Sequence, residues 1–289
     1  MLRRGRVPLV VSAVIVAMAL FGCSSTPKEP AVAPKVAPPM ISTEGILKAG
    51  VDMGYPPFAG VDEGHEVGLD VDVAAAIADR LGLELNLVDV SPSEIASALE
   101  SGKIDIALAA MPITDAILAD VTVAGSYVSD GPALFSLASS ATADATSNAS
   151  GVGEVDPADL GALRVGAQKE SAAWWKLESD YGEGFAKEYD SLRAAFQALE
   201  AGEVDVVAGD AIVGAYLTRD LPRVRYAGQL APAVPLGVSV AKDATELEKT
   251  VRDVLDVLAA DGVLDTIRTK WVGSLPQLRT ASTESSATP

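Results

Sequence analysis

The chain has 289 residues, of which 49% are hydrophobic and 21% are charged, and its formal net charge is −18 at pH 7. This length and apolar content suit one large or two medium folded domains and exclude a disordered chain. An acidic surface repels nucleic acid, so we expect no nucleic-acid partner.

The N-terminal segment has the pattern of an export signal. Arg3, Arg4 and Arg6 precede an uncharged run from Val7 to Phe21 that is too short to span a bilayer. Removal of residues 1–22 takes away these three arginines and no acid, which changes the net charge from −18 to −21. We therefore expect an exported protein.

The only cysteine, Cys23, follows Leu20-Phe21-Gly22, a pattern that resembles the lipobox of bacterial lipoproteins. The resemblance implies that Cys23 becomes the lipidated first residue, which anchors the protein to the outer face of the cytoplasmic membrane. A plain signal peptide, or a packed free thiol, is the alternative. Residues 23–43 are rich in proline and are predicted to be an extended tether.

The first strand is predicted from Gly45 to Val51, and a turn-rich loop from Asp52 to Phe58 follows it. Ligands of open α/β sheets bind at the carboxyl ends of strands, so this loop is a candidate binding segment. A helix that begins near Gly68 is predicted to end at Gly82. Asp70 and Asp72 fall in its first turn, where capping explains them better than a metal or acid-base role.

His65 has no partner at metal-ligand spacing and is interpreted as a solvated loop residue, and we expect no metal ion or cofactor. Further along, Leu83–Val90 is predicted to be a strand. Ser91-Pro92-Ser93-Glu94 is predicted to be a capping box with proline at the first helical position.

One segment occurs twice, as residues 98–110 and again as residues 198–210, and both copies contain Ala-Leu-Glu-x-Gly-x-x-Asp. Each copy is a helix ended by glycine and followed by a strand, which is half of a βαβ unit. The repetition predicts two α/β lobes of like construction. A chance match between two amphipathic helices is the alternative.

The remaining elements alternate in the same way. Their predicted order is a crossover strand (Tyr127–Leu137), a mobile surface loop (Ser139–Glu154), a strand (Leu163–Ala167), a helix with Trp174 and Trp175, a second crossover strand (Leu236–Val240), two helices from Thr245 to Gly262 and from Val263 to Val272, and a disordered tail (274–289). One tryptophan is expected in the core, and the other must point elsewhere.

From about Gly45 to Gly273 the chain resembles the bacterial extracellular solute-binding proteins of family 3, the polar-amino-acid binding components of ABC importers. The most specific match is Gly68-Leu69-Asp70-Val71-Asp72-Val73, and weaker matches are Tyr55-Pro56-Pro57-Phe58, both repeats and Lys270-Trp271-Val272-Gly273. The resemblance implies a two-lobe periplasmic-binding-protein type II fold, a clamshell with two crossover strands. Lobe 1 would comprise residues 44–128 and 231–273, and lobe 2 residues 129–230.

The resemblance also implies that the protein is a monomer that binds a small-molecule solute between its lobes and presents it to an ABC permease. In this family aromatic side chains enclose the solute, an Asp after the second repeat accepts its amine, and the turn after the first strand of lobe 2 donates to its carboxylate. The matching residues here are Tyr55, Asp210 and Ser171. Asp210 has the alternative interpretation of a helix cap.

Several positions depart from the family pattern. Ile117 stands where the carboxylate-binding Arg is expected, Ala110 and Pro112 replace small polar groups, Pro92 replaces an aromatic residue and Glu170 replaces a turn glycine. Loss of one partner of a buried ion pair costs about 3–5 kcal/mol. We therefore expect an amine on Asp210, with Tyr55 and Trp174 as walls and an apolar part against Ile117. Alternatively, Lys169 supplies the missing positive charge and amino-acid binding is retained.

Two further functions compete with solute transport. Some relatives of this fold are dehydratases of cyclohexadienyl acids, and Glu170 or Asp210 is a conceivable acid or base, but no nucleophile-base pair or phosphate loop is evident. We expect no enzymatic activity. Alternatively, the loss of polar pocket residues fits a sensor or partner-binding lipoprotein with a vestigial cleft.

Overall fold

The structure is a computed structural model that describes residues 33–138 and 155–281. The expected export signal, Cys23, the loop predicted for Ser139–Glu154 and residues 282–289 of the expected tail all lie outside the described residues. In the ranges that are described, no helix combines the length and the apolar character that crossing a membrane requires.

The first lobe contains five strands in one sheet, a small hairpin and five α-helices. Its sheet strands are β1 (Ile46–Val51), β4 (Glu84–Asp89), β5 (Ile106–Ala107), β6 (Thr122–Asp130) and β12 (Val234–Val240). The hairpin consists of β2 (Gly60–Asp62) and β3 (His65–Val67). The helices are α1 (Leu69–Leu81), α2 (Ile95–Glu100), α3 (Asp115–Asp120), α7 (Thr245–Ala260) and α8 (Val263–Val272).

The described residues of the second lobe form another five-stranded sheet and three α-helices. Its strands are β7 (Pro132–Leu137), β8 (Val165–Gln168), β9 (Lys187–Tyr189), β10 (Val206–Asp210) and β11 (Val224–Gln229). The helices are α4 (Ala172–Tyr181), α5 (Leu192–Glu200) and α6 (Ala211–Leu217).

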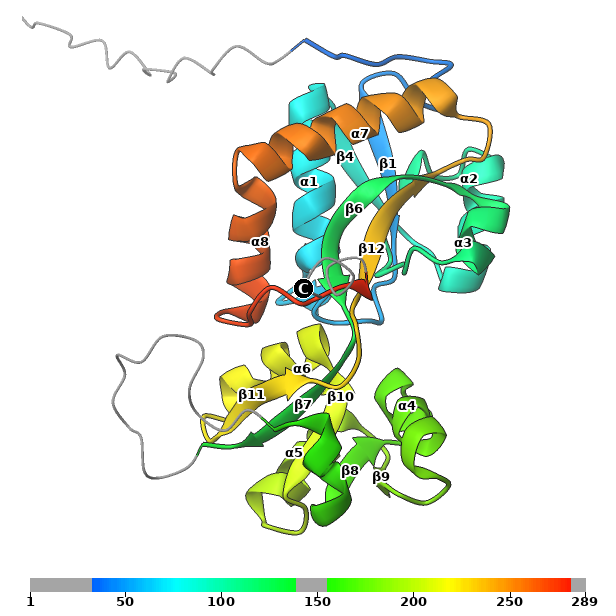
Figure 1. Cartoon of the computed structure of the whole chain (residues 1–289). Coiled ribbons are helices and arrows are strands. Elements are labelled where there is room, and N and C mark those ends of the chain that lie inside the picture. The colour runs from blue at the N-terminus through cyan, green and yellow to red at the C-terminus, as the bar shows by residue number, and fades with distance from the viewer. Residues whose placement is uncertain (1–32, 139–154, 282–289) are drawn as a thin grey trace, which may run out of the picture. The chain divides into compact units, whose positions relative to one another are not determined.

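The two sheets have the same construction, as Figure 1 shows. Their strand orders are β4-β1-β5-β12-β6 and β9-β8-β10-β7-β11. In each sheet the first three strands are parallel, and the last two are antiparallel to their neighbours. The predicted two-lobe α/β fold, with repeated helix-strand units, is therefore confirmed.

The Asp shared by the two repeats has the same role in both lobes. The Asp105 N–H donates to the Lys48 carbonyl at 2.8 Å, and its Oδ2 accepts from the Lys48 N–H at 2.9 Å. Asp205 and Arg164 make the same pair of contacts at 2.8 and 2.9 Å. In each repeat this Asp fixes the incoming strand against the first strand of its lobe.

The prediction of a single crossover strand over Tyr127–Leu137 is wrong in one respect. The strand is interrupted at Gly131, and its two parts, β6 and β7, belong to different sheets. A Cβ atom on Gly131 would lie only 2.9 Å from Cα of Ala233, which lies between β11 and β12 on the return path. The two crossings therefore pass close together, and glycine permits their contact.

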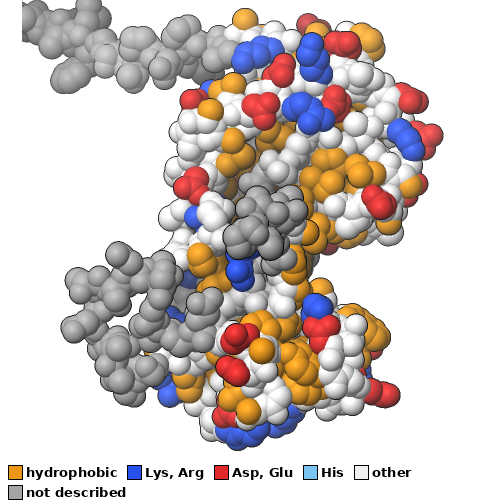
Figure 2. Space-filling view, in the orientation of Figure 1, with side chains coloured by type: hydrophobic (Ala, Val, Ile, Leu, Met, Phe, Trp, Pro, Cys, Tyr) orange, Lys and Arg blue, Asp and Glu red, His pale blue; other side chains and the backbone are white. Residues whose placement is uncertain are grey.

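The signature helix α1 has Gly68 at its N-cap and Gly82 at its C-cap. Gly82 ends the helix in the left-handed conformation, with a φ of 71°, as predicted. Buried apolar side chains of α1 and α7 form part of one core cluster with strands of the first sheet, among them Ile77, Val251 and Leu255. Charged side chains cover the outer face of α7, where Figure 2 shows red and blue side by side and where Arg252 pairs with Glu248.

The expected tether is corrected for residues 33–43. Val36 and Ile41 are buried in the core of the first lobe, and the Lys35 N–H donates to the Leu81 carbonyl at 2.9 Å. Burial of these apolar side chains stabilises the packed segment relative to an extended, solvated one.

The expected disordered tail is likewise corrected for residues 274–281. Leu275 is buried, the Arg279 N–H donates to Oε1 of Gln229 at 2.7 Å, and the Arg279 carbonyl accepts from the Ala233 N–H at 2.8 Å. The segment follows α8 of the first lobe and bonds to the end of β11 in the second. The prediction of disorder missed the burial of Leu275 and the two hydrogen bonds of the Arg279 backbone.

Candidate functional site

The loop after β1 presents Tyr55 on a buried support. Its ring stacks on Phe58 with centroids 5.2 Å apart, and Phe58 is fully buried. The Tyr55 carbonyl accepts from the Phe58 N–H at 3.0 Å, and Oδ1 of Asp52 accepts from the Gly54 N–H at 3.0 Å. Tyr55 itself is 37% exposed, so its ring offers a face to a ligand at the carboxyl end of the strand.

Asp210 ends β10 and stands at the N-cap position of α6, yet its side chain makes no capping hydrogen bond. The capping interpretation of its carboxylate is therefore wrong. Burial raises the pKa of Asp210 above its ordinary value. The carboxylate has no hydrogen-bond partner within the described residues, which leaves it available to a cation.

Asp130 provides the cap instead, from the end of crossover strand β6. Its Oδ1 accepts from the Ile212 N–H at 3.0 Å and from the Gly131 N–H at 2.8 Å. Burial, followed by the charge of Asp210, raises the pKa of Asp130 to about 7, and the amide donors oppose this shift. Sequence reasoning missed this residue; its only signal was Asp-Gly-Pro in the middle of a predicted strand.

The charges of Asp130 and Asp210 both act on the Tyr55 phenol. The pKa of the Tyr55 phenol is raised above its ordinary value by burial first, then by the charges of Asp210, Asp130, Asp52 and Asp70. Tyr55 comes from the first lobe and Asp210 from the second. The charge of Asp210 therefore acts on the Tyr55 phenol from the other lobe, in a negative environment.

Asp70 is fully buried and does not cap α1, which corrects its predicted role. Its Oδ1 accepts from the Tyr127 hydroxyl at 2.6 Å, and its Oδ2 accepts from the Ala110 N–H at 2.8 Å. Burial raises the pKa of Asp70 to about 6, although both hydrogen bonds oppose the shift. Ala109 and Ala110 have φ values of 50° and 48°, so Asp70 holds a left-handed turn after β5 in place.

Asp72 also has a different role from the predicted cap. Its Oδ2 accepts from Nζ of Lys270 at 2.6 Å and from Nε1 of Trp271 at 2.7 Å. The second acid of the signature therefore ties α1 to α8, and the two acids of the motif make different contacts.

In the first lobe, the positions that depart from the family pattern are apolar. Ile117, on α3, packs against the core cluster that contains Ile95 and Val121. Pro112 forms an isolated bridge with Leu236, and Pro92 is exposed at the start of a short 3-10 turn. None of these side chains can donate a hydrogen bond or a positive charge to a carboxylate.

In the second lobe, the turn after β8 uses its polar groups internally. Ser171 caps α4, since its Oγ accepts from the Trp174 N–H at 3.1 Å. Nζ of Lys169 lies 3.2 Å from Oε2 of Glu188, and this contact raises the pKa of Lys169. Glu170 has a φ of 61°, the left-handed conformation for which the family pattern places glycine.

The two tryptophans divide as predicted. Trp174 is half-buried against the core of the second lobe, whereas Trp175 is 58% exposed, and their rings meet edge to face at 4.5 Å. Nε1 of Trp174 is buried without a partner. Trp174 is thus part of its own lobe's core, and no described contact places it beside Tyr55.

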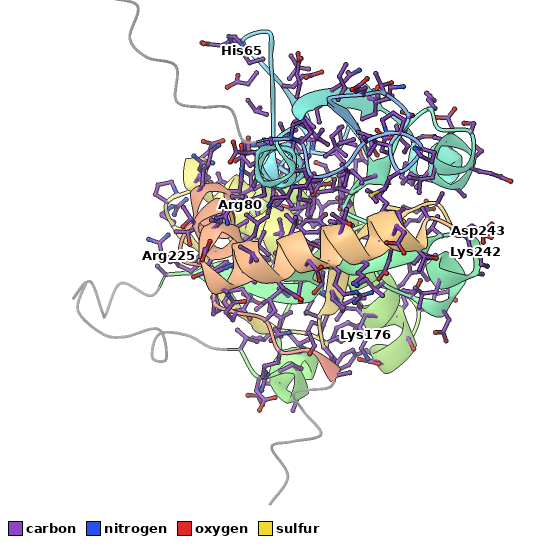
Figure 3. The ribbon with its side chains drawn as sticks, turned by 90° about the horizontal axis from the view of Figure 1, so that it is seen from above. His65, Arg80, Lys176, Arg225, Lys242 and Asp243 are labelled. Atoms are coloured by element: carbon purple, nitrogen blue, oxygen red, sulfur yellow. The ribbon has the colours of Figure 1, made fainter. Side chains whose placement is uncertain are left out.

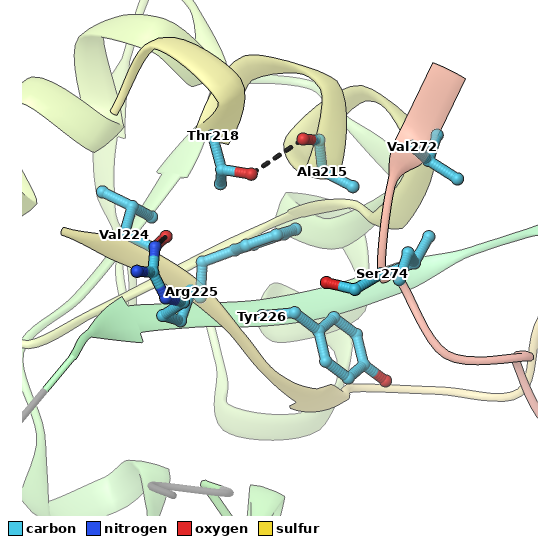
Figure 4. A pocket seen from close by; sticks show the side chains of 9 residues that line it. Ala215, Thr218, Val224, Arg225, Tyr226, Val272 and Ser274 are labelled. Atoms are coloured by element: carbon cyan, nitrogen blue, oxygen red, sulfur yellow. Dashed lines mark hydrogen bonds between the residues drawn. The ribbon is translucent and has the colours of Figure 1, made fainter. Parts of the chain in front are cut away.

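Two pockets lie next to these elements. One, of about 690 Å³, is lined by Met53, Pro56 and Pro57 from the Tyr55 loop and by Tyr216, Arg219 and Trp271 among others. The other, of about 340 Å³ (Figure 4), lies between α6, β11 and the segment after α8. Neither is lined by Asp130 or Asp210. His65 is exposed and points outward from the β2-β3 hairpin, as Figure 3 shows, in agreement with its prediction as a solvated residue.

Residues 47–274 match the model of the bacterial extracellular solute-binding proteins, family 3. The chain is 26% identical over 250 residues to an L-arginine-binding protein of Pseudomonas aeruginosa, which covers 81% of this chain and 90% of the relative.

Two solved structures are similar as well. An ancestral cationic amino acid solute-binding protein has a TM-score of 0.67 at 26% identity, with 79% of this chain and 96% of that chain covered. An ancestral arginine-binding protein bound to arginine has a TM-score of 0.55 at 31% identity, with 80% and 99% covered. The predicted type II periplasmic-binding-protein fold is therefore confirmed.

Proposed function

Because the chain belongs to the bacterial extracellular solute-binding proteins, family 3, we propose that it binds a small amine-bearing or amino-acid-like solute between its two lobes and delivers it to an ABC permease. The observation that supports the proposal is the pocket that the Tyr55 loop shares with Tyr216 of the second lobe. The charge of Asp210, whose carboxylate caps no helix, acts on the Tyr55 phenol of the same loop. A ligand that contacts both lobes stabilises one arrangement of them, which turns binding into a change of shape.

Lobe 1 consists of residues 44–128 and 231–273 and lobe 2 of residues 129–230 in this proposal. The packing of residues 33–43 on the first lobe's core extends its N-terminal limit, and the contacts of residues 274–281 link it to the second lobe. Both peptide crossings, at Gly131 and Ala233, serve as the hinge.

The test is calorimetry and thermal shift with a panel of amino acids, amines and guanidines, followed by Asp210→Asn. Removal of this charge is expected to weaken binding of a cationic solute by about 10- to 100-fold, as for the loss of one partner of a desolvated charge pair. Asp243→Asn, an exposed site outside both sheets, is the matched control and leaves the affinity unchanged. Equal affinities of the wild type and Asp210→Asn would contradict the proposed site.

The contributions of Ser171, Trp174, Ile117, Ala110 and Pro112 to the site are also proposals. Ser171 and Ala110 shape the turns that border it, through the Trp174 N–H and the Asp70 carboxylate. Ile117 and Pro112 provide an apolar boundary, and Trp174 supports the turn of the second lobe from inside its core.

We further propose that a lipid on Cys23 anchors the protein to the outer face of the cytoplasmic membrane and that the protein acts there as a monomer without a cofactor. Intact-mass measurement of detergent-extracted protein tests the lipid, and Cys23→Ser is expected to release the protein from membranes. Retention of the Cys23→Ser variant would contradict the anchor.

A role without catalysis completes the proposal. The acids whose charges act on Tyr55 complement a positively charged solute. Asp70 already accepts hydrogen bonds from the Tyr127 hydroxyl and the Ala110 N–H. Incubation of the purified protein with cyclohexadienyl acids is expected to give no turnover. Turnover that Asp210→Asn abolishes would identify an enzyme, and failure of the whole solute panel would favour the sensor interpretation.

A further inference from the structure

The deeper inference concerns the chemical class of the solute, and it rests on the proposed function. Two carboxylates converge at the crossover. Asp130 Oδ1 bonds to the Ile212 N–H, two residues beyond Asp210, and Asp210 is paired in the sheet with Pro132, two residues beyond Asp130. The two acids are thus held together by a strand pairing and a helix cap rather than by flexible loops.

No positive charge offsets this pair among the described residues around it. The charge of Asp210 acts on Asp130, and the Tyr55 phenol senses Asp210 and Asp130 together with Asp52 and Asp70. Tyr127 also senses Asp130. Lys169, the cation of the second lobe's turn, is paired with Glu188, and Lys270, beside the Tyr55 loop, is paired with Asp72. A second negative charge can form here only at the cost of repulsion and desolvation.

A second, independent observation concerns the other end of the solute. Where the family pattern places a carboxylate-binding Arg and small polar groups, this chain has Ile117, Ala110 and Pro112, and Ser171 spends its hydroxyl on the Trp174 N–H. The Ala110 N–H, a possible donor, is already bonded to Asp70. The side chains at these positions therefore offer a carboxylate neither a positive charge nor an uncommitted donor.

We propose that Asp130 and Asp210 bind the cationic group of an amine or guanidine that has no α-carboxylate, and that this cation displaces a proton held by the pair. The proton passes from the Asp130 carboxyl to solvent, and the cation then neutralises the carboxylate that remains. No covalent bond forms or breaks in this exchange other than that O–H bond. In this proposal the Asp130 carboxylate contacts the cationic group directly. The Ile212 and Gly131 N–H groups, which donate to Oδ1, fix the position of the carboxylate.

The experiment compares matched pairs that differ only in the carboxylate: agmatine with L-arginine, and cadaverine with L-lysine. Calorimetry is run at pH 6 and pH 8 in two buffers of different ionisation enthalpy, which counts the protons released. We expect the amine of each pair to bind at least tenfold more tightly than its amino acid. Since the pKa of Asp130 is about 7, binding should release about one proton at pH 6 and be about tenfold tighter at pH 8.

Asp130→Asn retains an oxygen that can accept from the Ile212 N–H but cannot ionise. It should abolish the proton release and reduce the pH 8 affinity for the amine at least tenfold. Asp156→Asn is the matched control, because Asp156 also accepts a backbone N–H, from Ala158, at the start of a 3-10 helix. It should leave both the release and the affinity unchanged.

The possible failures are distinguishable. Equal or tighter binding of the amino acid, or proton release that persists in Asp130→Asn, overturns this inference and leaves the solute-binding function in place. Absence of binding by both members of each pair and by the standard amino acids overturns the proposed function itself, and this inference with it.

Discussion

The hydroxyl of Tyr127 on the crossover strand donates a hydrogen bond of 2.6 Å to Oδ1 of Asp70 on the signature helix, and both side chains are buried. The other oxygen of Asp70 accepts from the Ala110 N–H at 2.8 Å. One carboxylate therefore joins α1, β6 and the turn after β5. This joint sets the path of the turn that contains Ala110, which belongs to the proposed site.

Tyr127→Phe should lower the free energy of unfolding by about 1–3 kcal/mol at pH 8, because it leaves a buried carboxylate with a single partner. Urea denaturation measures the change. Tyr181→Phe is the control, since its exposed hydroxyl bonds to the Pro157 carbonyl, and it should cost less than about 0.5 kcal/mol. Equal losses in the two variants would show that Asp70 does not need the phenol.

The stability of the ligand-free protein should fall as the pH rises towards 7. The folded-state pKa of Asp130, about 7, lies above its unfolded value near 4. Its contribution to stability is complete below pH 4 and is lost as the pH rises through 7, since the folded state then loses the extra proton. Asp70, with a folded-state pKa of about 6, acts in the same direction.

Asp130→Asn removes this loss and should stabilise the ligand-free protein by at least about 1 kcal/mol at pH 8 while changing little at pH 4. Denaturant titrations at the two pH values provide the comparison. A gain of the same size at both pH values would mean that the substitution acts through packing rather than through ionisation.

Gly68→Ala should destabilise the protein by about 3 kcal/mol or more. Gly68 has a φ of 153°, and a Cβ atom there would lie 2.0 Å from the Phe58 carbonyl oxygen, which no small shift relieves. Gly161→Ala is a suitable comparison, because nothing lies within 4 Å of its Cβ position. Thermal unfolding of both variants tests the difference, and similar melting temperatures would contradict it.

Leu275→Ala should cost about 2–4 kcal/mol, because the side chain is buried in the core although it lies in a segment of small polar residues. Leu118→Ala, which removes a 45% exposed leucine on α3, should cost less than about 1 kcal/mol. If Leu275→Ala behaved like the exposed variant, the segment would contribute nothing to the fold, and the original prediction of an unstructured tail would be restored.

Lys169→Ala should change the solute affinity less than about twofold, because this side chain is half-exposed and paired with Glu188, and exposed ion pairs contribute little. Lys187→Ala is the matched control, with the equivalent pair to Glu203. Calorimetry with agmatine and L-arginine provides the measurement. A tenfold loss for L-arginine alone would instead identify Lys169 as the carboxylate-binding cation.

The sequence by itself determined what short-range rules control. Backbone preference and apolar periodicity act within a few residues. They could therefore predict the helices that end at glycine, the strand before the Tyr55 loop, the Ser91 capping box and the repeated Asp. The repeat then implied two lobes, since each half-unit must bury its apolar face against a sheet.

The tertiary structure decided which acids act and how. Asp70 seemed to be a cap and is a buried joint, Asp210 seemed free to cap its helix and does not, and Asp130 gave almost no signal yet caps that helix from 82 residues away. Val36 lay in a proline-rich segment and Leu275 in a predicted tail, and both are core residues. The physical reason is that the pKa and the partners of a carboxylate depend on burial and on groups brought near it by distant parts of the chain, which local patterns do not encode.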